Sequence, residues 1–290
     1  MKIFCNLLKQ RLGKALVLLG FAVVATQSYA WVMVTTSDKV LFTDQNVQTP
    51  WYSMPTSGSW GVPAQVSASS VATGVAVMVN TAGIPFIKHS SYDYWVQLNL
   101  PRGEASFKKI VISADGKFMY GLTSDASLYG ADISNLASSG YLAVWNSAIR
   151  PIKDVTITAN YAYAVSTQGS IYAAARSNYA GFNRIPAGGY LTSISSGKQY
   201  LSGVELIWGI GGDGNIWYKT ENPADSWYQL PGGGDVRTGN WVDVSPDPTG
   251  YQLWARDRWN GLFMINYNNW PNVSSTWQNA RVTSVSGFRR

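Results

Sequence analysis

Apolar and polar positions alternate over short runs throughout the chain after residue 30, and clusters of Gly, Pro, Ser, Asn and Asp separate these runs. The runs are rich in Val, Ile, Tyr and Trp, which pack well on a pleated, half-buried surface. No stretch after residue 30 keeps the 3.6-residue apolar period of an amphipathic helix. The pattern therefore predicts an all-β chain.

A pair formed by an aliphatic residue or proline and a following aromatic recurs six times, each time just after a turn. The pairs are Leu41-Phe42, Pro85-Phe86, Leu128-Tyr129, Ile171-Tyr172, Ile216-Trp217 and Leu262-Phe263. The aromatics lie 44, 43, 43, 45 and 46 residues apart. Three other series of short segments run in phase with them. Each repeat thus holds four strands in about 45 residues, which is the size of a propeller blade.

The two ends of the chain hold complementary parts of one repeat. The sequence stops after one strand of the innermost type, Val282 to Phe288, and the three strand types that should follow it begin after residue 30. Pairing them would close a ring and remove the exposed sheet edges of an open structure. We therefore predict one domain, residues 31–290: a six-bladed β-propeller of four-stranded blades, closed by pairing the C-terminal strand with the N-terminal three strands. Most of the thirteen tryptophans, Trp217 and Trp227 among them, are then expected to pack between blades.

The first thirty residues resemble a secretory signal peptide. Four basic residues lie before an apolar run from Ala15 to Ala25, and Ser28-Tyr29-Ala30 offers small residues at the cleavage positions. The run is shorter than the roughly 20 residues that a membrane-spanning helix needs, and no later stretch is long and apolar enough. We expect cleavage after Ala30, a secreted or periplasmic protein and no transmembrane segment.

Removing this leader changes the charge and the cysteine count. The whole chain has a net charge of +6, but four positive and no negative residues lie in the leader, which leaves +2. Nucleic-acid binding loses its main support. Cys5 leaves with the leader, so no disulfide, thiolate nucleophile or thiolate metal site is expected.

The residues after the leader give little support for catalysis or cofactor binding. His89 is the only histidine, follows a predicted strand and is expected at a surface or turn. The carboxylates are scattered, many in turns, although a pair assembled across blades could hydrolyse glycosides. The run Gly209–Gly214 matches a dinucleotide fingerprint, yet a strand pattern follows it where a helix is required. Asn272-Val273-Ser274 matches a glycosylation acceptor, but we give this match little weight because the leader resembles a bacterial one. We expect no enzyme, cofactor or metal site.

The repeat unit resembles the tectonin repeat. Its best copies are Trp227-Tyr228-Gln229-Leu230-Pro231-Gly232, leading to Val242-Asp243-Val244-Ser245, and Trp208-Gly209-Ile210, leading to Asp213-Gly214-Asn215-Ile216-Trp217. The similarity covers nearly all of residues 31–290, with degenerate first and third copies. Tectonin-type propellers include secreted lectins, so the resemblance implies glycan binding, including glycans of bacterial surfaces such as lipopolysaccharide.

One turn departs from the others. Four residues before the shared aromatic, the first five repeats have Asp38, Ala82, Asp125, Gln168 and Asp213, whereas the sixth has Trp259. An indole is hard to bury in a turn, and its neighbours Arg256, Asp257, Arg258 and Asn260 could bind hydroxyl or phosphate groups while the ring stacks on a sugar. The alternative is that Trp259 folds back onto a blade. Trp60 and Trp270, in polar loops, are further candidates for the same reason.

These observations favour a monomeric, non-enzymatic lectin that binds glycans through loops at the blade rims, at one or two sites. Two alternatives stay open. A protein-interaction scaffold would carry a contiguous apolar patch on one face, and a hydrolase would bring carboxylates together at the ring axis.

Overall fold

The structure is a computed structural model, and the residues it describes make up most of the chain after residue 31. They are 32–35, 40–43, 52–53, 60–69, 74–89, 95–103, 106–136, 139–140, 142–186, 189–198, 203–231, 240–246, 252–266, 274–282 and 284–287. Trp270, Asn272 and the leader lie outside the described residues. Among the described residues, no helix has the length and hydrophobicity needed to cross a membrane.

Twenty of the strands form five antiparallel blades, each made of four strands consecutive in the chain. Blade 1 is β4 (Pro63–Ala68), β5 (Val75–Asn80), β6 (Pro85–His89) and β7 (Val96–Gln97), and blade 2 is β8 (Phe107–Ile112), β9 (Phe118–Thr123), β10 (Leu128–Asp132) and β11 (Asn146–Ser147). Blade 3 is β12 (Ile152–Ile157), β13 (Tyr161–Ser166), β14 (Ile171–Ala175) and β15 (Asn183–Arg184), and blade 4 is β16 (Leu191–Lys198), β17 (Glu205–Gly211), β18 (Ile216–Thr220) and β19 (Tyr228–Gln229). Blade 5 is β20 (Trp241–Pro246), β21 (Gln252–Asp257), β22 (Gly261–Asn266) and β23 (Ser274–Arg281).

The remaining strands form a composite sheet from both ends of the chain. Its order is β24-β1-β2-β3, with β24 (Ser284–Gly287), β1 (Val32–Thr35), β2 (Val40–Thr43) and β3 (Tyr52–Ser53). Strands β24 and β1 are antiparallel, with Val32 opposite Gly287 and Thr35 opposite Ser284. The all-β propeller with four-stranded antiparallel blades is thus confirmed. The chain has five contiguous blades, and a count of six requires the composite sheet to act as a blade.

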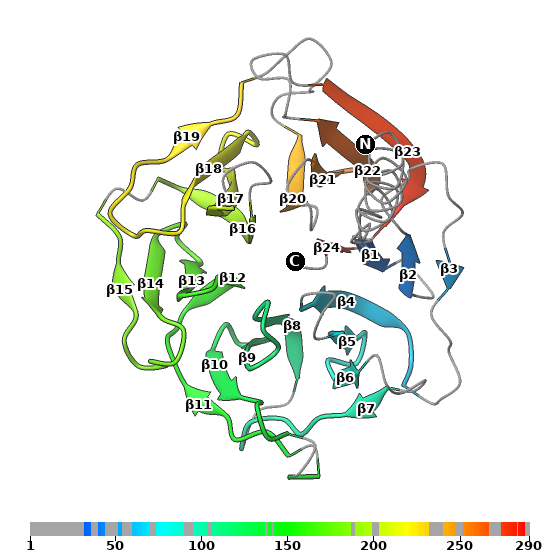
Figure 1. Cartoon of the computed structure of the whole chain (residues 1–290), viewed down its shortest axis with the longest axis vertical. Helices are drawn as coiled ribbons and strands as arrows, with labels where there is room; N and C mark the ends of the chain where they lie inside the picture. The colour runs from blue at the N-terminus through cyan, green and yellow to red at the C-terminus, as the bar shows by residue number, and fades with distance from the viewer. Residues whose placement is uncertain are drawn as a thin grey trace, which may run out of the picture.

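The sheets are arranged around one axis, with the first strand of each blade innermost (Figure 1). Contacts between innermost strands follow this order, from β4 through β8, β12, β16 and β20 to β24, and β24 also contacts β4. The shared aromatics of the five contiguous repeats lie in the third strand of each blade, as the sequence spacing predicts. The run Gly209–Gly214 belongs to a strand and a turn and opens no helix.

The core consists of apolar clusters between adjacent blades. Between blades 4 and 5, Trp208 and Leu230 pack in one cluster with Trp241 and Ala255. Comparable clusters join blade 1 to blade 2, blade 2 to blade 3 and blade 3 to blade 4. At roughly 25 cal/mol per Å² of buried apolar area, such clusters supply the main stabilising term for a chain expected to lack disulfides.

The turn between the second and third strands has the same backbone conformation in all five blades. Its third position has a positive φ in each case, at Gly83, Ala126, Gly169, Gly214 and Asn260. The carbonyl of this residue accepts a hydrogen bond from a backbone N–H at or just before the beginning of the next innermost strand; examples are Ile152 N to Ala126 O, 2.8 Å, and Val282 N to Asn260 O, 2.9 Å. Each of these turns therefore ties its blade to the beginning of the next innermost strand.

Candidate functional site

The Trp259 turn connects β21 to β22 and exposes an indole, as the sequence predicts. Trp259 is 48 % exposed, and the guanidinium carbon of Arg258 lies 4.2 Å from its ring centroid. Arg256 Nη1 donates to Asn260 Oδ1 over 2.9 Å. The turn thus presents an aromatic ring stacked with one cation, next to a second guanidinium held by the neighbouring amide.

Asp257 has a different part in this turn, because it is buried and acts on the backbone. Its Oδ1 accepts hydrogen bonds from the backbone N–H groups of Trp259, 2.9 Å away, and Gly261, 2.7 Å away. Asn80 occupies the equivalent position in blade 1, and its Oδ1 likewise accepts from Ala82 and Ile84. Asp257 is therefore a positioning residue that holds the turn in shape.

We expect Asp257→Ala to lower the free energy of unfolding by about 1–3 kcal/mol, because two backbone N–H groups lose their acceptor. Trp259→Ala should change it by less than about 0.5 kcal/mol, as is usual for exposed side chains. Urea unfolding of both variants measures the difference. Equal effects would mean that Asp257 does not support the turn.

The expectation that Trp60 is exposed is wrong, because the structure buries it. Trp60 is only 6 % exposed and packs against Trp95, with ring centroids 6.2 Å apart. It belongs to an apolar cluster of blade 1, and its carbonyl accepts a hydrogen bond from Asn80 Nδ2 over 2.8 Å. A polar loop sequence gave no sign that the ring folds onto the adjacent strands. Of the other candidates, Trp270 lies outside the described residues, and His89 is the last residue of β6.

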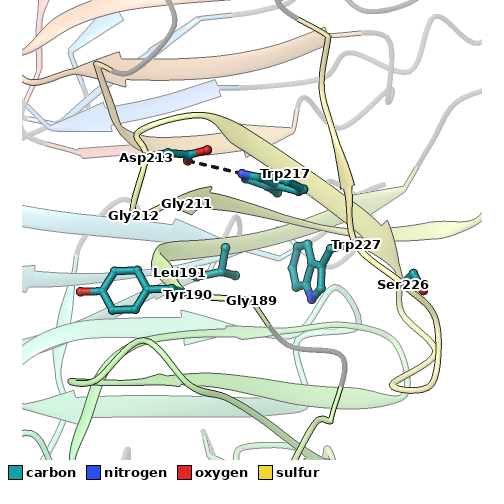
Figure 2. A pocket seen from close by; sticks show the side chains of 9 residues that line it. All are labelled: Gly189, Tyr190, Leu191, Gly211, Gly212, Asp213, Trp217, Ser226 and Trp227. Atoms are coloured by element: carbon teal, nitrogen blue, oxygen red, sulfur yellow. Dashed lines mark hydrogen bonds between the residues drawn. The ribbon is translucent and has the colours of Figure 1, made fainter.

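A second candidate site is a cavity of about 620 Å³ in blade 4, lined by residues from the start of β16, the turn after β17, Trp217 of β18 and the segment just before β19. Sequence reasoning assigned its two tryptophans to packing alone. Its lining residues are Gly189, Tyr190, Leu191, Gly211, Gly212, Asp213, Trp217, Ser226 and Trp227 (Figure 2). We call it the aromatic cavity.

The charged group of the aromatic cavity is the Asp213 carboxylate. Trp217 Nε1 points at Asp213 Oδ1, 3.5 Å away (Figure 2). Burial acts to raise the pKa of Asp213, but hydrogen bonds from Asn215 and Trp217 hold it below its usual value, so the group is a carboxylate at neutral pH. Trp227 is half-buried against the cluster between blades 3 and 4, and its Nε1 atom is buried without a hydrogen-bond partner among the described residues.

Glycines let the aromatic rings approach the backbone in the aromatic cavity. A Cβ added to Gly212 would lie 2.4 Å from Tyr190 Cδ1, and one added to Gly211 would lie 2.7 Å from Trp217 Nε1. Tyr190 itself is 57 % exposed, and Lys153 Nζ lies 4.9 Å from its ring centroid. The adjacent glycines near a tryptophan are the sequence signal that could have indicated this cavity.

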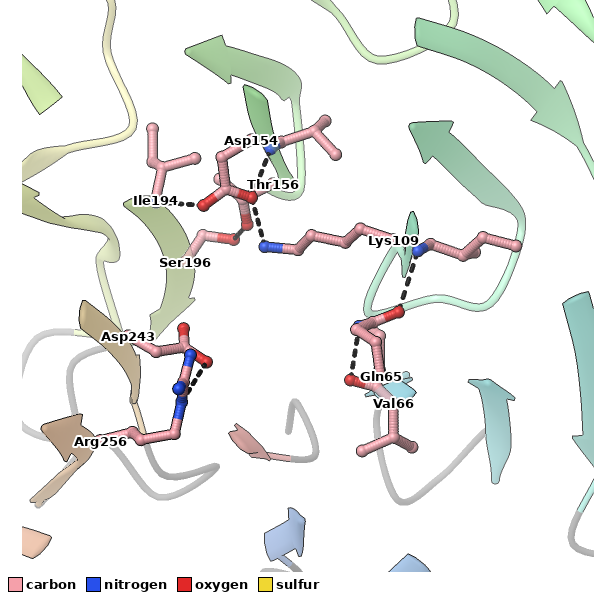
Figure 3. Close-up of polar contacts among 12 residues, drawn as sticks. Gln65, Val66, Lys109, Asp154, Thr156, Ile194, Ser196, Asp243 and Arg256 are labelled. Atoms are coloured by element: carbon pink, nitrogen blue, oxygen red, sulfur yellow. Dashed lines mark hydrogen bonds and ion pairs between the residues drawn. The ribbon is translucent and has the colours of Figure 1, made fainter. Parts of the chain in front are cut away.

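A third group of residues surrounds the ring axis where the innermost strands begin. All five contiguous blades have a β-bulge there, between Pro63 and Gln65 in β4 and at the corresponding place in β8, β12, β16 and β20. Because a bulge changes the direction of side chains, two consecutive residues of each strand line one cavity of about 330 Å³. They are Ala64 and Gln65, Lys108 and Lys109, Lys153 and Asp154, Thr192 and Ser193, and Val242 and Asp243, with Arg256 completing the lining. We call this cavity the channel mouth (Figure 3).

Side chains of the channel mouth also connect neighbouring blades. Lys109 Nζ lies 2.5 Å from Asp154 Oδ1, and Asp154 Oδ2 accepts from Ile194 N of β16 over 2.8 Å. Gln65 Oε1 accepts from Ile110 N of β8 over 2.9 Å. Asp154 thus joins three blades, and Gln65 joins two (Figure 3).

The two carboxylates at the axis bear on the hydrolase alternative. Asp154 and Asp243 both line the channel mouth, which is the convergence that this alternative requires. However, Asp154 accepts bonds from Lys109, Val155 N and Ile194 N, and Asp243 Oδ2 lies 3.9 Å from Arg256 Nε. Because its contacts are donors, Asp154 is poorly placed to act as the general acid of glycoside hydrolysis. The described residues contain no cluster of three metal-ligating side chains.

Comparisons with known proteins support the fold. No protein-family model and no curated protein matches the chain, so the resemblance to the tectonin repeat has no matching model behind it. A solved structure described as YCF48 bound to D1 peptide is similar, with a TM-score of 0.51 and 14 % sequence identity. The match covers 86 % of this chain and 78 % of that one. At this identity the likeness shows a shared β-propeller fold.

Proposed function

We propose that this chain is a non-enzymatic carbohydrate-binding protein and that the aromatic cavity is its principal glycan site. The observation that carries the proposal is the convergence of Tyr190, Trp217 and Trp227 with the Asp213 carboxylate around one concave surface. Aromatic faces suit the apolar C–H groups of a sugar ring. Asp213 would accept hydrogen bonds from sugar hydroxyls.

Within the same proposal, the Trp259 turn is a secondary glycan site. It offers an exposed indole and the guanidinium of Arg256, held beside Asn260. Single sites of this kind are expected to bind weakly, with dissociation constants in the range of about 1 mM to 1 μM. Two sites on one rigid ring raise the avidity for a polysaccharide that reaches both. A monomer secreted to the periplasm or beyond, with bacterial surface glycans such as lipopolysaccharide as ligands, fits this proposal.

Trp227→Ala is expected to weaken glycan binding at least about tenfold, because truncating a central aromatic anchor commonly costs more than 1 kcal/mol. Residues 31–290 would be tested on an array of bacterial and host glycans, and hits would be measured by calorimetry. Tyr228→Ala is the matched control, since Tyr228 is adjacent and exposed but does not line the aromatic cavity. Trp259→Ala reports on the secondary site.

Absence of binding to every glycan by the folded wild type would contradict the proposal. Equal losses in Trp227→Ala and Tyr228→Ala would contradict the assignment to the aromatic cavity. A loss confined to Trp259→Ala would make the Trp259 turn the principal site.

A protein-interaction scaffold is the second candidate, and one observation favours it. Leu142 and Val144 in blade 2 are exposed, and both lie next to β11. Exposed apolar side chains close together are a common feature of protein-binding surfaces. A glycan array on which no glycan binds would favour this candidate over carbohydrate binding.

We further infer that the composite sheet acts as a sixth blade. Strand β24 contacts the innermost strands on both sides, β20 of blade 5 and β4 of blade 1, and β1 also contacts β4. In a ring closed in this way, every innermost strand has a neighbouring innermost strand on both sides.

A further inference from the structure

We propose that the channel mouth binds an oxyanion, a carboxylate or phosphate, on an acidic glycan whose sugar rings occupy the aromatic cavity. This inference rests on the proposed function and adds the chemical class of the glycan. It depends on three observations: the excess of cations at the channel mouth, the geometry that presents them, and the continuity between the two cavities.

The channel mouth holds more positive than negative charge. Its described lining includes Lys108, Lys109, Lys153 and Arg256 but only the carboxylates of Asp154 and Asp243. Lys109 is paired with Asp154, and Arg256 with Asp243. Lys108 and Lys153 have no carboxylate within ion-pair distance among the described residues, so two ammonium groups remain for a ligand.

The bulges explain why these cations meet. In a regular strand, Lys108 and Lys109 would point to opposite faces, whereas the bulge between Phe107 and Lys109 lets both line one cavity. The bulge between Ile152 and Asp154 does the same for Lys153 and Asp154. Bulges that redirect side chains are common next to functional sites.

The environment of the two unpaired lysines favours an anion. Burial lowers the pKa of Lys108, and the neighbouring Lys109 adds to this effect while Asp154 opposes it. Burial also lowers the pKa of Lys153, again against Asp154. An anion bound at the channel mouth would give these two lysines partners for charge-assisted hydrogen bonds, which are stronger than neutral ones.

The aromatic cavity and the channel mouth adjoin through one short segment. Tyr190 and Leu191 line the aromatic cavity, while Thr192 and Ser193 line the channel mouth. Tyr190 and Thr192 are thus roughly 7 Å apart along the strand. Lys153 belongs to the channel mouth and also lies over the Tyr190 ring. One oligosaccharide can therefore stack on aromatic rings and place an acidic substituent among the lysines.

The test compares glycans that differ only in charge. Oligogalacturonate and its neutral methyl ester probe a carboxylate, and lipopolysaccharide before and after dephosphorylation probes a phosphate. We expect at least one acidic form to bind about tenfold more tightly than its neutral counterpart at low salt, with the difference shrinking as salt screens the charges. The double variant Lys108→Gln/Lys153→Gln should lose this preference, so that its affinities for the acidic and the neutral form become equal.

Lys117→Gln is the matched control, because Lys117 is exposed on the turn between β8 and β9 and does not line the channel mouth. Thermal unfolding in inorganic phosphate, compared with chloride at equal ionic strength, gives a second measurement that needs no sugar. Phosphate should raise the melting temperature of the wild type and of Lys117→Gln but not of the double variant.

The outcomes separate the two proposals. Equal affinity for acidic and neutral forms, or a preference that survives in the double variant, would overturn the oxyanion site and leave glycan binding standing. Binding of inorganic phosphate without binding of any glycan would overturn the glycan proposal, and the acidic-glycan assignment with it. Binding of an acidic peptide alone would assign the channel mouth to a protein partner.

Discussion

Replacing Asp154 by alanine is expected to lower the free energy of unfolding by about 3–5 kcal/mol, the usual cost of removing one partner of a buried ion pair. Asp154 is buried at the start of β12 and holds Lys109 of blade 2 and the backbone N–H of Ile194 in blade 4. The substitution leaves Lys109 without its carboxylate and Ile194 N without its acceptor.

A double-mutant cycle separates the ion pair from the backbone bonds. Lys109→Met alone removes the charge pair, and Asp154→Asn retains an oxygen that can accept from Ile194 N. We expect Asp154→Ala to be the most destabilising of the three and the Lys109→Met/Asp154→Ala pair to be non-additive, because the residues are in contact. Urea unfolding measures each variant. If Asp154→Ala lowers the free energy of unfolding by less than about 1 kcal/mol, the ion pair contributes no more than an exposed salt bridge does.

The strands could be predicted from the sequence because their signal is local. Alternation of apolar residues and the regular spacing of Phe86, Tyr129, Tyr172, Trp217 and Phe263 both follow from the pleat and from the size of one blade. The same repeats predicted the pairing of β24 with β1, since one incomplete unit at each end can complete the other. The order of the strands in the sheets therefore required no information beyond the pattern.

The candidate site was harder to predict because its signals are not local. Trp60 and Trp259 both follow polar residues, yet Trp60 is buried against Trp95 while Trp259 is exposed. That difference depends on whether the neighbouring strands provide apolar side chains against which each ring can pack. Asp257 was expected to contact the ligand, but a carboxylate directly before a tight turn can accept hydrogen bonds from the turn's own backbone N–H groups.

Cavities depend even more on tertiary structure. Trp217 and Trp227 occupy the same repeat positions as aromatics in other blades, so the pattern predicted packing for both. In the structure the concave surface beside them depends on Gly211 and Gly212, where a side chain would collide with neighbouring groups. The bulges that gather Lys108 and Lys153 at the channel mouth leave no signature in the alternation, because an extra residue at the start of a strand resembles part of the preceding loop.

Deleting residues 284–290 is expected to remove most of the stability of the domain, which for proteins of this kind is about 5–15 kcal/mol in total. The deletion leaves β1 paired with β2 alone, without its antiparallel partner on the axis side, and removes the strand that contacts both β20 and β4. We expect the urea midpoint to fall sharply. We also expect the truncated chain to self-associate on size-exclusion chromatography, because an unpaired strand edge accepts other strands.

Deleting residues 288–290 alone is the control, since β24 ends at Gly287. A peptide of residues 282–290 added in trans should restore a single cooperative transition to the truncated chain, because a free strand can add to an exposed sheet edge. Equal midpoints for the full chain and the 284–290 deletion would mean that five blades suffice and that the composite sheet contributes little. Rescue by the peptide would instead show that a non-covalent strand pair closes the ring. The relative placement of the aromatic cavity and the channel mouth would then depend on both ends of the chain, because blades 3 to 5 hold their positions only within a closed ring.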